Sequence, residues 1–373
     1  MSESDLPEPD RVDGAPHPRQ TYTLFGHETA EAAFIEAVDS GKLHHAWMIT
    51  GPRGVGKATL AWRMARYLLA LPPDDGPGLF GDPLPPPTTL ESDPDSSLNK
   101  RIEALSEPRL MLIRRGPTDD GKRLRSQISV EEVRKLNAFF GLSAADGGYR
   151  VVIVDALDEM NVASANALLK LLEEPPKNAV LLLVCHQPSR VLPTIRSRCR
   201  ELRLSSLGSE DLQRALEDVG TEPAQVAAMS EMSGGSVGRT LALLQVDGPD
   251  LYAEILHILA SCPNLDRGRA SKLAELAAAR GAETRLDAIV ELLDLALARI
   301  AKAGAGVHPK AEILPGENEV LTRLSGSLHR SFAWADLQQH ARSRIEHGRA
   351  VNVAPQSLIL DVFVKAAAIA GSP

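Results

Sequence analysis

The segment Gly51–Ala58 reads GPRGVGKA and decides the fold of this 373-residue chain. The apolar run Ala46–Thr50 before it predicts a buried strand, and apolar residues at helical spacing from Thr59 to Leu71 predict a helix after it. A glycine-rich turn between a strand and a helix lets backbone N–H groups converge on phosphate oxygens, and the first turn of the helix attracts the same anion. The segment therefore predicts a phosphate-binding loop at the start of an α/β domain, rather than a glycine turn that only joins two elements.

The residues expected to hold the phosphates are three glycines and a lysine: Gly51, Gly54, Gly56 and Lys57. In the complete motif a Ser or Thr follows the lysine and gives its hydroxyl to Mg²⁺. Ala58 occupies that position and has no oxygen, while Thr59 lies about 100° further round the helix. The sequence therefore predicts a degenerate nucleotide site that requires no cofactor, although Lys57 leaves weak ATP binding open.

A second motif, which ends in an acidic residue, also lacks one of its usual catalytic groups. Val151–Val154 is a β-branched run, which predicts a central strand covered on both faces, and Asp155 follows it directly. Alone, Asp155 would be interpreted as a helix or turn cap; together with the phosphate-binding loop it indicates a Walker B carboxylate that could hold Mg²⁺ through water. Hydrolysing proteins usually carry a Glu next, to position the attacking water, but Ala156 stands there and Asp158 is two positions further on.

The order of expected elements divides the chain. Short strands and helices alternate up to about residue 204, and unbroken apolar strands such as Ala179–Val184 indicate a parallel sheet. Only helical patterns follow. We expect an α/β domain with a parallel sheet at 21–204, a small helical domain at 205–246 and a helical C-terminal domain at 247–373.

Two segments have compositions typical of disorder. Residues 1–20 are rich in proline and charge. Residues 72–97 hold eight prolines and six acids without a Lys or Arg. Neither segment offers enough apolar surface to offset the entropy of ordering. We therefore expect a disordered N-terminus and a flexible acidic, proline-rich insertion.

The charge balance limits the partners that the chain can attract by itself. Its net charge is −8, so contact with DNA would need a local basic surface or a partner's charge. A small basic cluster lies at Lys122, Arg123 and Arg125, although such a cluster is more often a solvated face. No apolar run is long enough to span a bilayer and the N-terminus does not resemble a signal peptide, so we expect a cytoplasmic protein.

The cysteines do not indicate a metal site. They are Cys185, Cys199 and Cys262, and no two of them form a C-x-x-C pair. Three cysteines cannot fill a four-cysteine zinc site. We therefore expect reduced thiols and no bound metal.

Three further segments have distinctive sequences. His44–Trp47 precedes the phosphate-binding loop, Asn166–Pro176 reads NALLKLLEEPP, and Ser197–Cys199 reads SRC. Together they resemble the bacterial clamp-loader AAA+ family, which has an SRC motif of its own. The resemblance covers about Phe25–Leu244 and is looser in the helical tail. It implies a AAA+ P-loop domain, a small helical lid domain and a helical C-terminal collar domain.

An SRC motif beside a degraded P-loop is similar to the subunit of this family that does not hydrolyse ATP. The resemblance implies a place in the DNA polymerase III holoenzyme, with the tau/gamma ATPase and delta subunits as partners. The sliding clamp and primed DNA would be reached through the complex. Arg198 would then serve in trans as an arginine finger on a γ-phosphate held by a neighbour. The alternative is that Arg198 packs structurally against its own domain.

Other family positions are altered as well. The hydroxyl of the first sensor falls at Cys185 or His186, and Gly238 stands where the second sensor has an Arg, with Arg239 one place late. Some family members carry a four-cysteine zinc module after the P-loop helix. Residues 72–97 occupy that region here, so the resemblance also implies that zinc is absent.

Three rival functions fit these features less well. An active clamp-loader ATPase of the tau/gamma kind would need replacements for the chemistry missing at Ala58 and Ala156. A AAA+ motor that remodels DNA would need intact Walker motifs. A simple DNA-binding module is disfavoured by the acidic balance. We therefore expect no intrinsic ATPase activity.

Overall fold

The computed structural model describes residues 8–12, 14–72, 87–118, 120, 123–141, 147–221, 226–279, 283–309, 311–351 and 353–372. The chain forms two compact units. The first comprises Met1–Glu222 together with Ser236–Gly238, and the second comprises Pro223–Gly235 together with Arg239–Pro373.

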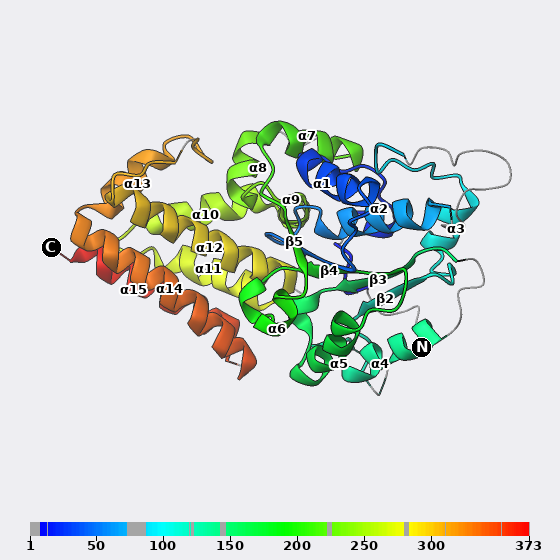
Figure 1. Cartoon of the computed structure of the whole chain (residues 1–373). Helices are drawn as coiled ribbons and strands as arrows, with labels where there is room; N and C mark the ends of the chain where they lie inside the picture. Colours follow the sequence, from blue (N-terminus) through cyan, green and yellow to red (C-terminus); the bar gives the residue numbers. More distant parts are fainter. Residues whose placement is uncertain are drawn as a thin grey trace. The chain divides into compact units, whose positions relative to one another are not determined.

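A five-stranded parallel sheet organises the first unit (Figure 1). Its strands are β1 (Ala46–Thr50), β2 (Leu110–Arg114), β3 (Arg150–Asp155), β4 (Ala179–Cys185) and β5 (Arg200–Arg203), in the order β2-β3-β4-β1-β5. The strand before the glycine-rich loop is therefore flanked by β4 and β5, and the strand that ends in Asp155 is flanked by β2 and β4. Because all strands run the same way, their carboxyl ends, which include the loop and Asp155, meet at one edge of the sheet.

Helices cover both faces of this sheet, as Figure 1 shows. The helices of this unit are α1 (Glu28–Asp39), α2 (Lys57–Ala70), α3 (Ser97–Glu103), α4 (Val130–Gly141), α5 (Val162–Glu173), α6 (Pro193–Arg196) and α7 (Ser209–Asp218). Neighbouring residues of β1 point to opposite layers: Trp47 packs in the core with α1 and α2, and Met48 packs in the core with α4 and α5. The predicted α/β fold class with a parallel sheet, followed by helices, is confirmed.

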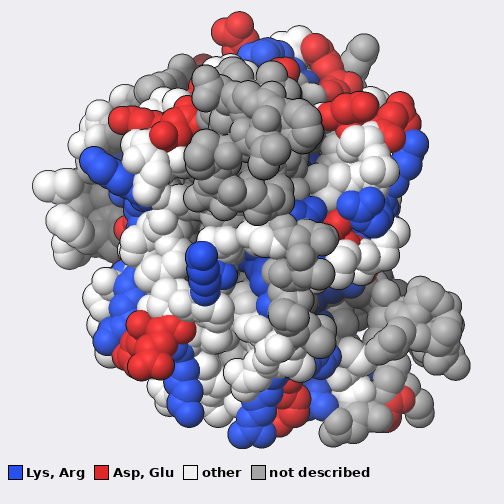
Figure 2. Space-filling model, turned by 45° about the vertical axis from the view of Figure 1, so that its right-hand side comes forward, with Lys and Arg blue, Asp and Glu red and all other residues white. Residues whose placement is uncertain are grey.

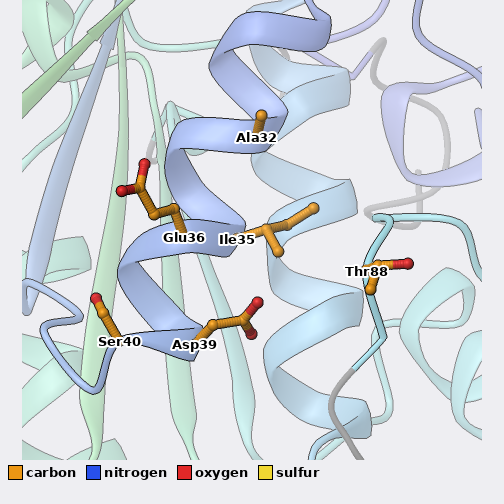
Figure 3. Close-up of a pocket in the computed structure, with 6 residues that line it drawn as sticks. All are labelled: Ala32, Ile35, Glu36, Asp39, Ser40 and Thr88. Carbon is orange, nitrogen blue, oxygen red and sulfur yellow. The ribbon is translucent and has the colours of Figure 1, made fainter.

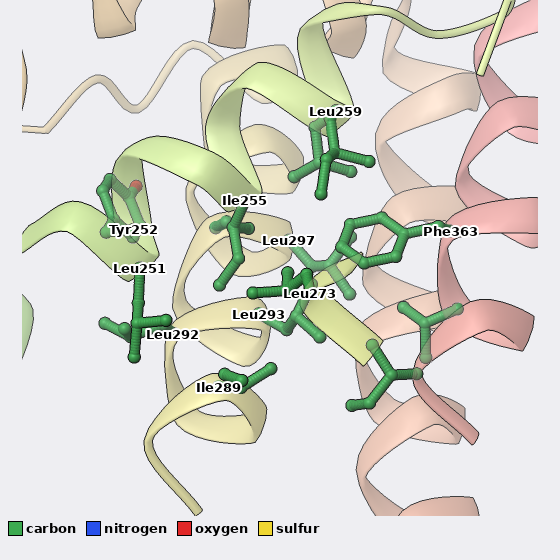
Figure 4. Packing of buried hydrophobic residues seen from close by; sticks show 14 of the residues in the cluster. Leu251, Tyr252, Ile255, Leu259, Leu273, Ile289, Leu292, Leu293, Leu297 and Phe363 are labelled. Carbon is green, nitrogen blue, oxygen red and sulfur yellow. The ribbon is translucent and has the colours of Figure 1, made fainter. Parts of the chain in front are cut away.

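The second unit is helical. Its elements are α8 (Val226–Ser233), most of α9 (Val237–Leu244), α10 (Gly248–Ala260), α11 (Arg267–Ala278), α12 (Glu283–Gly304), α13 (Glu317–Ser325), α14 (Leu328–Ala350) and α15 (Pro355–Gly371). Apolar residues from α10, α11, α12 and α15 meet in one core, where Ile255, Leu297 and Phe363 are fully buried (Figure 4). Spacing of apolar residues by three or four positions gives each helix an inward stripe, which explains why a chain so rich in Ala and Leu folds as a bundle here.

The N-terminal segment is more ordered than its composition predicts. Residues 1–7 and 13 lie outside the described residues, but His17 is fully buried and Pro18–Gln20 forms a 3₁₀ turn. Ion pairs with distant residues order this segment. Composition does not reveal such pairs, which is why the structure differs from the expected disorder.

The expected insertion is also shorter than predicted. Residues 73–86 lie outside the described residues, but Leu90 is only 1% exposed and packs in the core of the first unit. Ser96 caps α3 by accepting a hydrogen bond from the backbone N–H of Asn99 at 3.2 Å. The end of the predicted segment nearest α3 therefore belongs to the folded unit.

The region predicted as a separate lid is divided between the two units, α7 falling in the first and α8 in the second. The exact domain boundaries therefore remain predictions. Over the part of the chain that the structure describes, no helix combines the length and apolar character needed to cross a membrane.

Candidate functional site

The glycine-rich loop adopts a backbone that only glycine accommodates. Gly51, Gly54 and Gly56 have φ angles of 140°, 74° and 103°, a region that L side chains rarely adopt. A Cβ on Gly51 would lie 2.3 Å from the carbonyl oxygen of Leu204, and one on Gly56 would lie 2.5 Å from a methyl group of Leu24. The loop thus keeps the form of a phosphate cradle, but neighbouring chain packs closely against it.

Lys57 is held by its own loop. The residue is 3% exposed, and its Nζ donates a hydrogen bond to the carbonyl oxygen of Gly51 at 2.8 Å and a second to that of Pro52. Burial lowers the pKa of Lys57 to about 8, and the carboxylates of Asp155 and Asp158 oppose this shift. The ammonium is therefore already supplied with oxygen partners inside the loop.

The segment Ser236–Gly238 closes against the same loop. Ser236 Oγ donates to the carbonyl oxygen of Arg53 at 2.8 Å, and the backbone N–H of Gly238 donates to that of Gly54 at 3.1 Å. A Cβ at Gly238 would lie only 3.0 Å from the Cα of Gly54. Within the second unit, Arg239 lies 3.1 Å from Glu291 Oε2. A backbone contact therefore stands at the position where the resemblance to clamp-loader proteins led us to expect an arginine.

Asp155 lies at the end of β3 and is nearly buried, at 8% exposed. Burial raises its pKa to about 7, and the nearby carboxylates of Asp10 and Glu159 add to this shift. Ala156, which follows, is buried, and its side chain has no polar atom. Asp158 Oδ1 accepts a hydrogen bond from the backbone N–H of His186 at 2.7 Å, so this carboxylate binds the end of β4.

The first-sensor position offers no hydroxyl. Cys185 pairs with Thr50 in the register of β4 and β1, which places its buried thiol beside the start of the loop. Burial raises the pKa of Cys185 to about 12, with Asp158 adding to the shift, and burial together with Lys57 lowers the pKa of His186 to about 3. Both groups are therefore neutral at pH 7.

Arg198 lies between α6 and β5, and the residues that it contacts lie outside the glycine-rich loop. Its Nη2 is 2.9 Å from Glu173 Oε1, and its Nη1 donates to the carbonyl oxygen of Thr194 at 2.9 Å. The side chain is 37% exposed. The guanidinium is therefore ordered by two partners of its own domain and is still accessible.

The structure brings five of the six predicted site residues together: Gly51, Gly54, Gly56, Lys57 and Asp155. Arg198 has none of them among its contacts. Sequence reasoning missed the charged residues beside Asp155, namely Asp10 and Arg114. Arg114 could have been found, because the apolar run Leu110–Ile113 before it indicates a strand whose carboxyl end joins the same edge of the sheet.

The other described surfaces offer weaker candidates for a binding site. An open pocket of about 500 Å³ lies along the outer side of α1, where Ile35, Glu36, Asp39 and Thr88 line it, and its acidic lining does not suit a phosphate (Figure 3). On the face in Figure 2, acidic and basic side chains are interspersed. Lys122 of the predicted basic cluster lies outside the described residues. Among the residues that are described, no group of three or more His, Cys, Asp or Glu side chains could hold a metal ion.

Residues 26–208 match the model of a family described as DNA polymerase III, delta subunit. DNA polymerase III subunit delta′ of Pseudomonas aeruginosa is 34% identical over 237 residues, which are 62% of this chain and 65% of that protein. DNA polymerase III subunit gamma/tau of Mycobacterium tuberculosis is 30% identical over 229 residues, covering 59% of this chain and 36% of that protein. The matches thus span less than two thirds of these relatives' length.

One solved structure, a DNA polymerase III gamma subunit-related protein from Thermotoga maritima, covers 91% of this chain at 15% identity with a TM-score of 0.35. At that score the superposition carries no argument, so the fold assignment rests on the strand order and the position of the loop.

Proposed function

We propose that the chain belongs to the clamp-loader family of DNA polymerase III subunits and serves there as a delta-prime subunit that does not hydrolyse ATP. In this role it assembles in the cytoplasm with tau/gamma ATPase subunits and a delta subunit. The complex uses ATP bound by the ATPase subunits to load the sliding clamp onto primed DNA. This chain contributes structural support and one guanidinium, that of Arg198.

The observation that carries the proposal is a contrast between the chain's own nucleotide site, which lacks catalytic groups, and Arg198, which is accessible. Hydrolysis lacks a hydroxyl at Ala58 and a carboxylate at Ala156, and the backbone of Gly238 lies against the loop where an arginine would be needed. Arg198, in contrast, is 37% exposed and ordered. A subunit that has lost its own chemistry but keeps an accessible arginine fits a role at a neighbour's site.

The chemistry of Arg198 suits that role. A guanidinium is permanently charged and presents a planar fork of donors to phosphate oxygens. Its partner Glu173 has a side chain that is 49% exposed, and an exposed ion pair of this kind contributes about 0–1 kcal/mol. The pair therefore holds the arginine in place at little cost when a phosphate replaces the carboxylate.

The test is an Arg198→Ala variant in a reconstituted complex with the ATPase and delta subunits. We expect normal assembly and a partial fall in DNA-stimulated ATP turnover, because one of several ATP sites loses a group that is typically responsible for about 10³-fold or more at its own site. Arg198→Lys should rescue incompletely, since an ammonium lacks the fork.

The matched control is Arg196→Ala, which removes the same charge two residues away on the exposed end of α6. It should assemble and turn over ATP as the unmodified complex does. If Arg198→Ala assembles and retains full turnover and clamp loading, Arg198 is structural and the proposed role in trans is wrong.

One observation favours a second candidate, an active clamp-loader ATPase: the match to gamma/tau subunits at 30% identity. This reading requires the isolated chain to hydrolyse ATP in a way that Lys57→Ala abolishes. The missing groups at Ala58 and Ala156 argue against it.

A further inference from the structure

The N-terminal segment Glu8–Val12, here called the acidic strap, reaches the carboxyl end of β2. Asp10 Oδ1 lies 2.6 Å from Arg114 Nη1, and Glu8 Oε1 lies 3.2 Å from the same nitrogen. Glu8 also pairs with Arg19 at 2.6 Å. The strap is therefore fixed by two arginines: Arg114 of the sheet, and Arg19 of the 3₁₀ turn that follows the strap in the chain.

A buried histidine holds the strap from the other side. The backbone N–H of Arg19 donates to His17 Nδ1 at 3.0 Å, so Nε2 is the nitrogen that bears the proton. That Nε2 lies 3.1 Å from Asp10 Oδ2, and the side chains of His17 and Asp10 are 0% and 1% exposed. The rings of His17 and of Trp62 on α2 pack edge to face, with their centroids 6.2 Å apart. Charges buried this deeply persist only when they are paired, which marks a specific contact rather than a loose tail.

The strap lies at the nucleotide end of the sheet. Arg114 pairs with Asp155 in the register of β2 and β3, so its partner Asp10 is close to the Walker B carboxylate. This proximity is also why Asp10 contributes to the raised pKa of Asp155. A methyl group of Val12 lies 3.4 Å from where a Cβ on Gly238 would be, and Gly238 in turn contacts the glycine-rich loop. The strap thus packs against Gly238, and Gly238 packs against the glycine-rich loop.

The cations at this end of the sheet already have acidic or carbonyl partners. Arg53 and Arg115 both pair with Glu159, at 3.0 and 2.8 Å. Lys57 donates to carbonyl oxygens of the loop. Arg114 pairs with the strap. A nucleotide's phosphates would have to displace these oxygens, and the carboxylates among them supply negative charge in the place of a polyphosphate.

We propose that the acidic strap is an internal occupant of the nucleotide cleft, so that strap and nucleotide compete for one place and the folded chain excludes ATP and ADP. The cleft is then closed by the chain's own N-terminus in addition to its missing catalytic groups. The proposal concerns the same cleft as the proposed function but does not depend on Arg198, so either can fail without the other.

The test measures ADP binding to the full chain and to a chain lacking residues 2–12, by titration calorimetry with and without Mg²⁺. We expect about ten-fold or tighter binding once the strap is gone, because a cleft that is open in only a tenth of molecules loses that factor in apparent affinity. Adding Lys57→Ala to the shortened chain should abolish the gain. A gain that survives Lys57→Ala would place ADP elsewhere and overturn the proposal, as would a folded shortened chain that binds no tighter.

A second variant serves if the deletion does not fold. Glu8→Gln/Asp10→Asn keeps the shape of the strap and removes its charge, and it should also tighten ADP binding. Asp93→Asn/Asp95→Asn removes the same charge from an exposed turn of the same unit and should change nothing. In the unmodified chain, hydrogen exchange of the strap amides gives an independent reading. ADP that binds there while strap protection stays unchanged would refute the competition.

Discussion

Glu317 makes the second unit sensitive to a single substitution. This carboxylate is 0% exposed at the start of α13. Its oxygens accept hydrogen bonds from Tyr252 Oη at 2.5 Å and from the backbone N–H of Ile313 at 2.7 Å, and Arg299 Nε lies 2.8 Å away. Glu317→Ala removes a partner from each of these groups at once.

The loss of unfolding free energy in Glu317→Ala depends on which partners Arg299 keeps. Breaking a buried ion pair by removing one partner typically costs about 3–5 kcal/mol, because the other charge stays buried. Arg299 keeps Glu231 at 3.0 Å, so we expect the lower end of that range, about 3 kcal/mol. The matched control is Glu291→Ala, which breaks a pair with Arg239 whose two side chains are 48% and 39% exposed. An exposed pair contributes about 0–1 kcal/mol.

Urea unfolding followed by tryptophan fluorescence measures the difference. Trp334 is buried in the second unit, and Trp47 and Trp62 are replaced by Phe in every sample so that they do not contribute. With an m-value of about 2 kcal/mol/M, the Glu317→Ala midpoint should fall by about 1.5 M and the Glu291→Ala midpoint by less than about 0.5 M. Equal midpoints for the two variants would show that the buried network does not stabilise the unit.

Three further outcomes are expected. The isolated chain should show no ATP turnover above background, because Ala58 and Ala156 lack the Mg²⁺ hydroxyl and the water-positioning carboxylate; phosphate release that Lys57→Ala abolishes would contradict this. Folding raises the pKa of Asp155 from 3.8 to about 7. Between pH 3.8 and 7 the folded chain therefore binds more protons than the unfolded chain. The free energy of unfolding that this group contributes falls as the pH rises through that window. Asp155→Asn should therefore stabilise the chain more at pH 8 than at pH 5 in thermal or urea unfolding, and a gain that does not grow with pH would oppose the assignment. Replacing residues 73–86 by a short Gly/Ser linker should leave the thermal midpoint nearly unchanged, because loop-closure entropy varies slowly with length, and a large drop would show that the segment packs.

The strands and the loop were predictable because their signals are local. An apolar run of five residues followed by glycines at fixed spacing determines β1 and Gly51–Ala58 without reference to the rest of the chain. The missing groups at Ala58 and Ala156 could be predicted for the same reason.

The contacts of the N-terminal segment could not be predicted in this way. Asp10 and Arg114 are separated by 104 positions, and Pro-rich acidic sequence usually lacks the apolar surface needed for order. A few buried ion pairs supply that order here, and pairing between charges so far apart leaves no periodic trace in a single sequence. The partners of Arg198 were missed likewise, since Glu173 lies on α5 and approaches it only through the fold.

The contact between Gly54 and Gly238 bears on which substitutions could give this site the ability to hydrolyse ATP. Restoring a hydroxyl at position 58 or a carboxylate at position 156 would leave the loop pressed against Gly238, and any side chain at that glycine would meet backbone at 3.0 Å. Backbone, unlike the end of a flexible side chain, cannot turn aside. A side chain at Gly238 would therefore bring strain until the loop moved, whatever residues stood at positions 58 and 156. If the site is inactive as proposed, substitutions at those two positions alone would not suffice to make it hydrolyse ATP, because the packing at Gly238 would have to change with them.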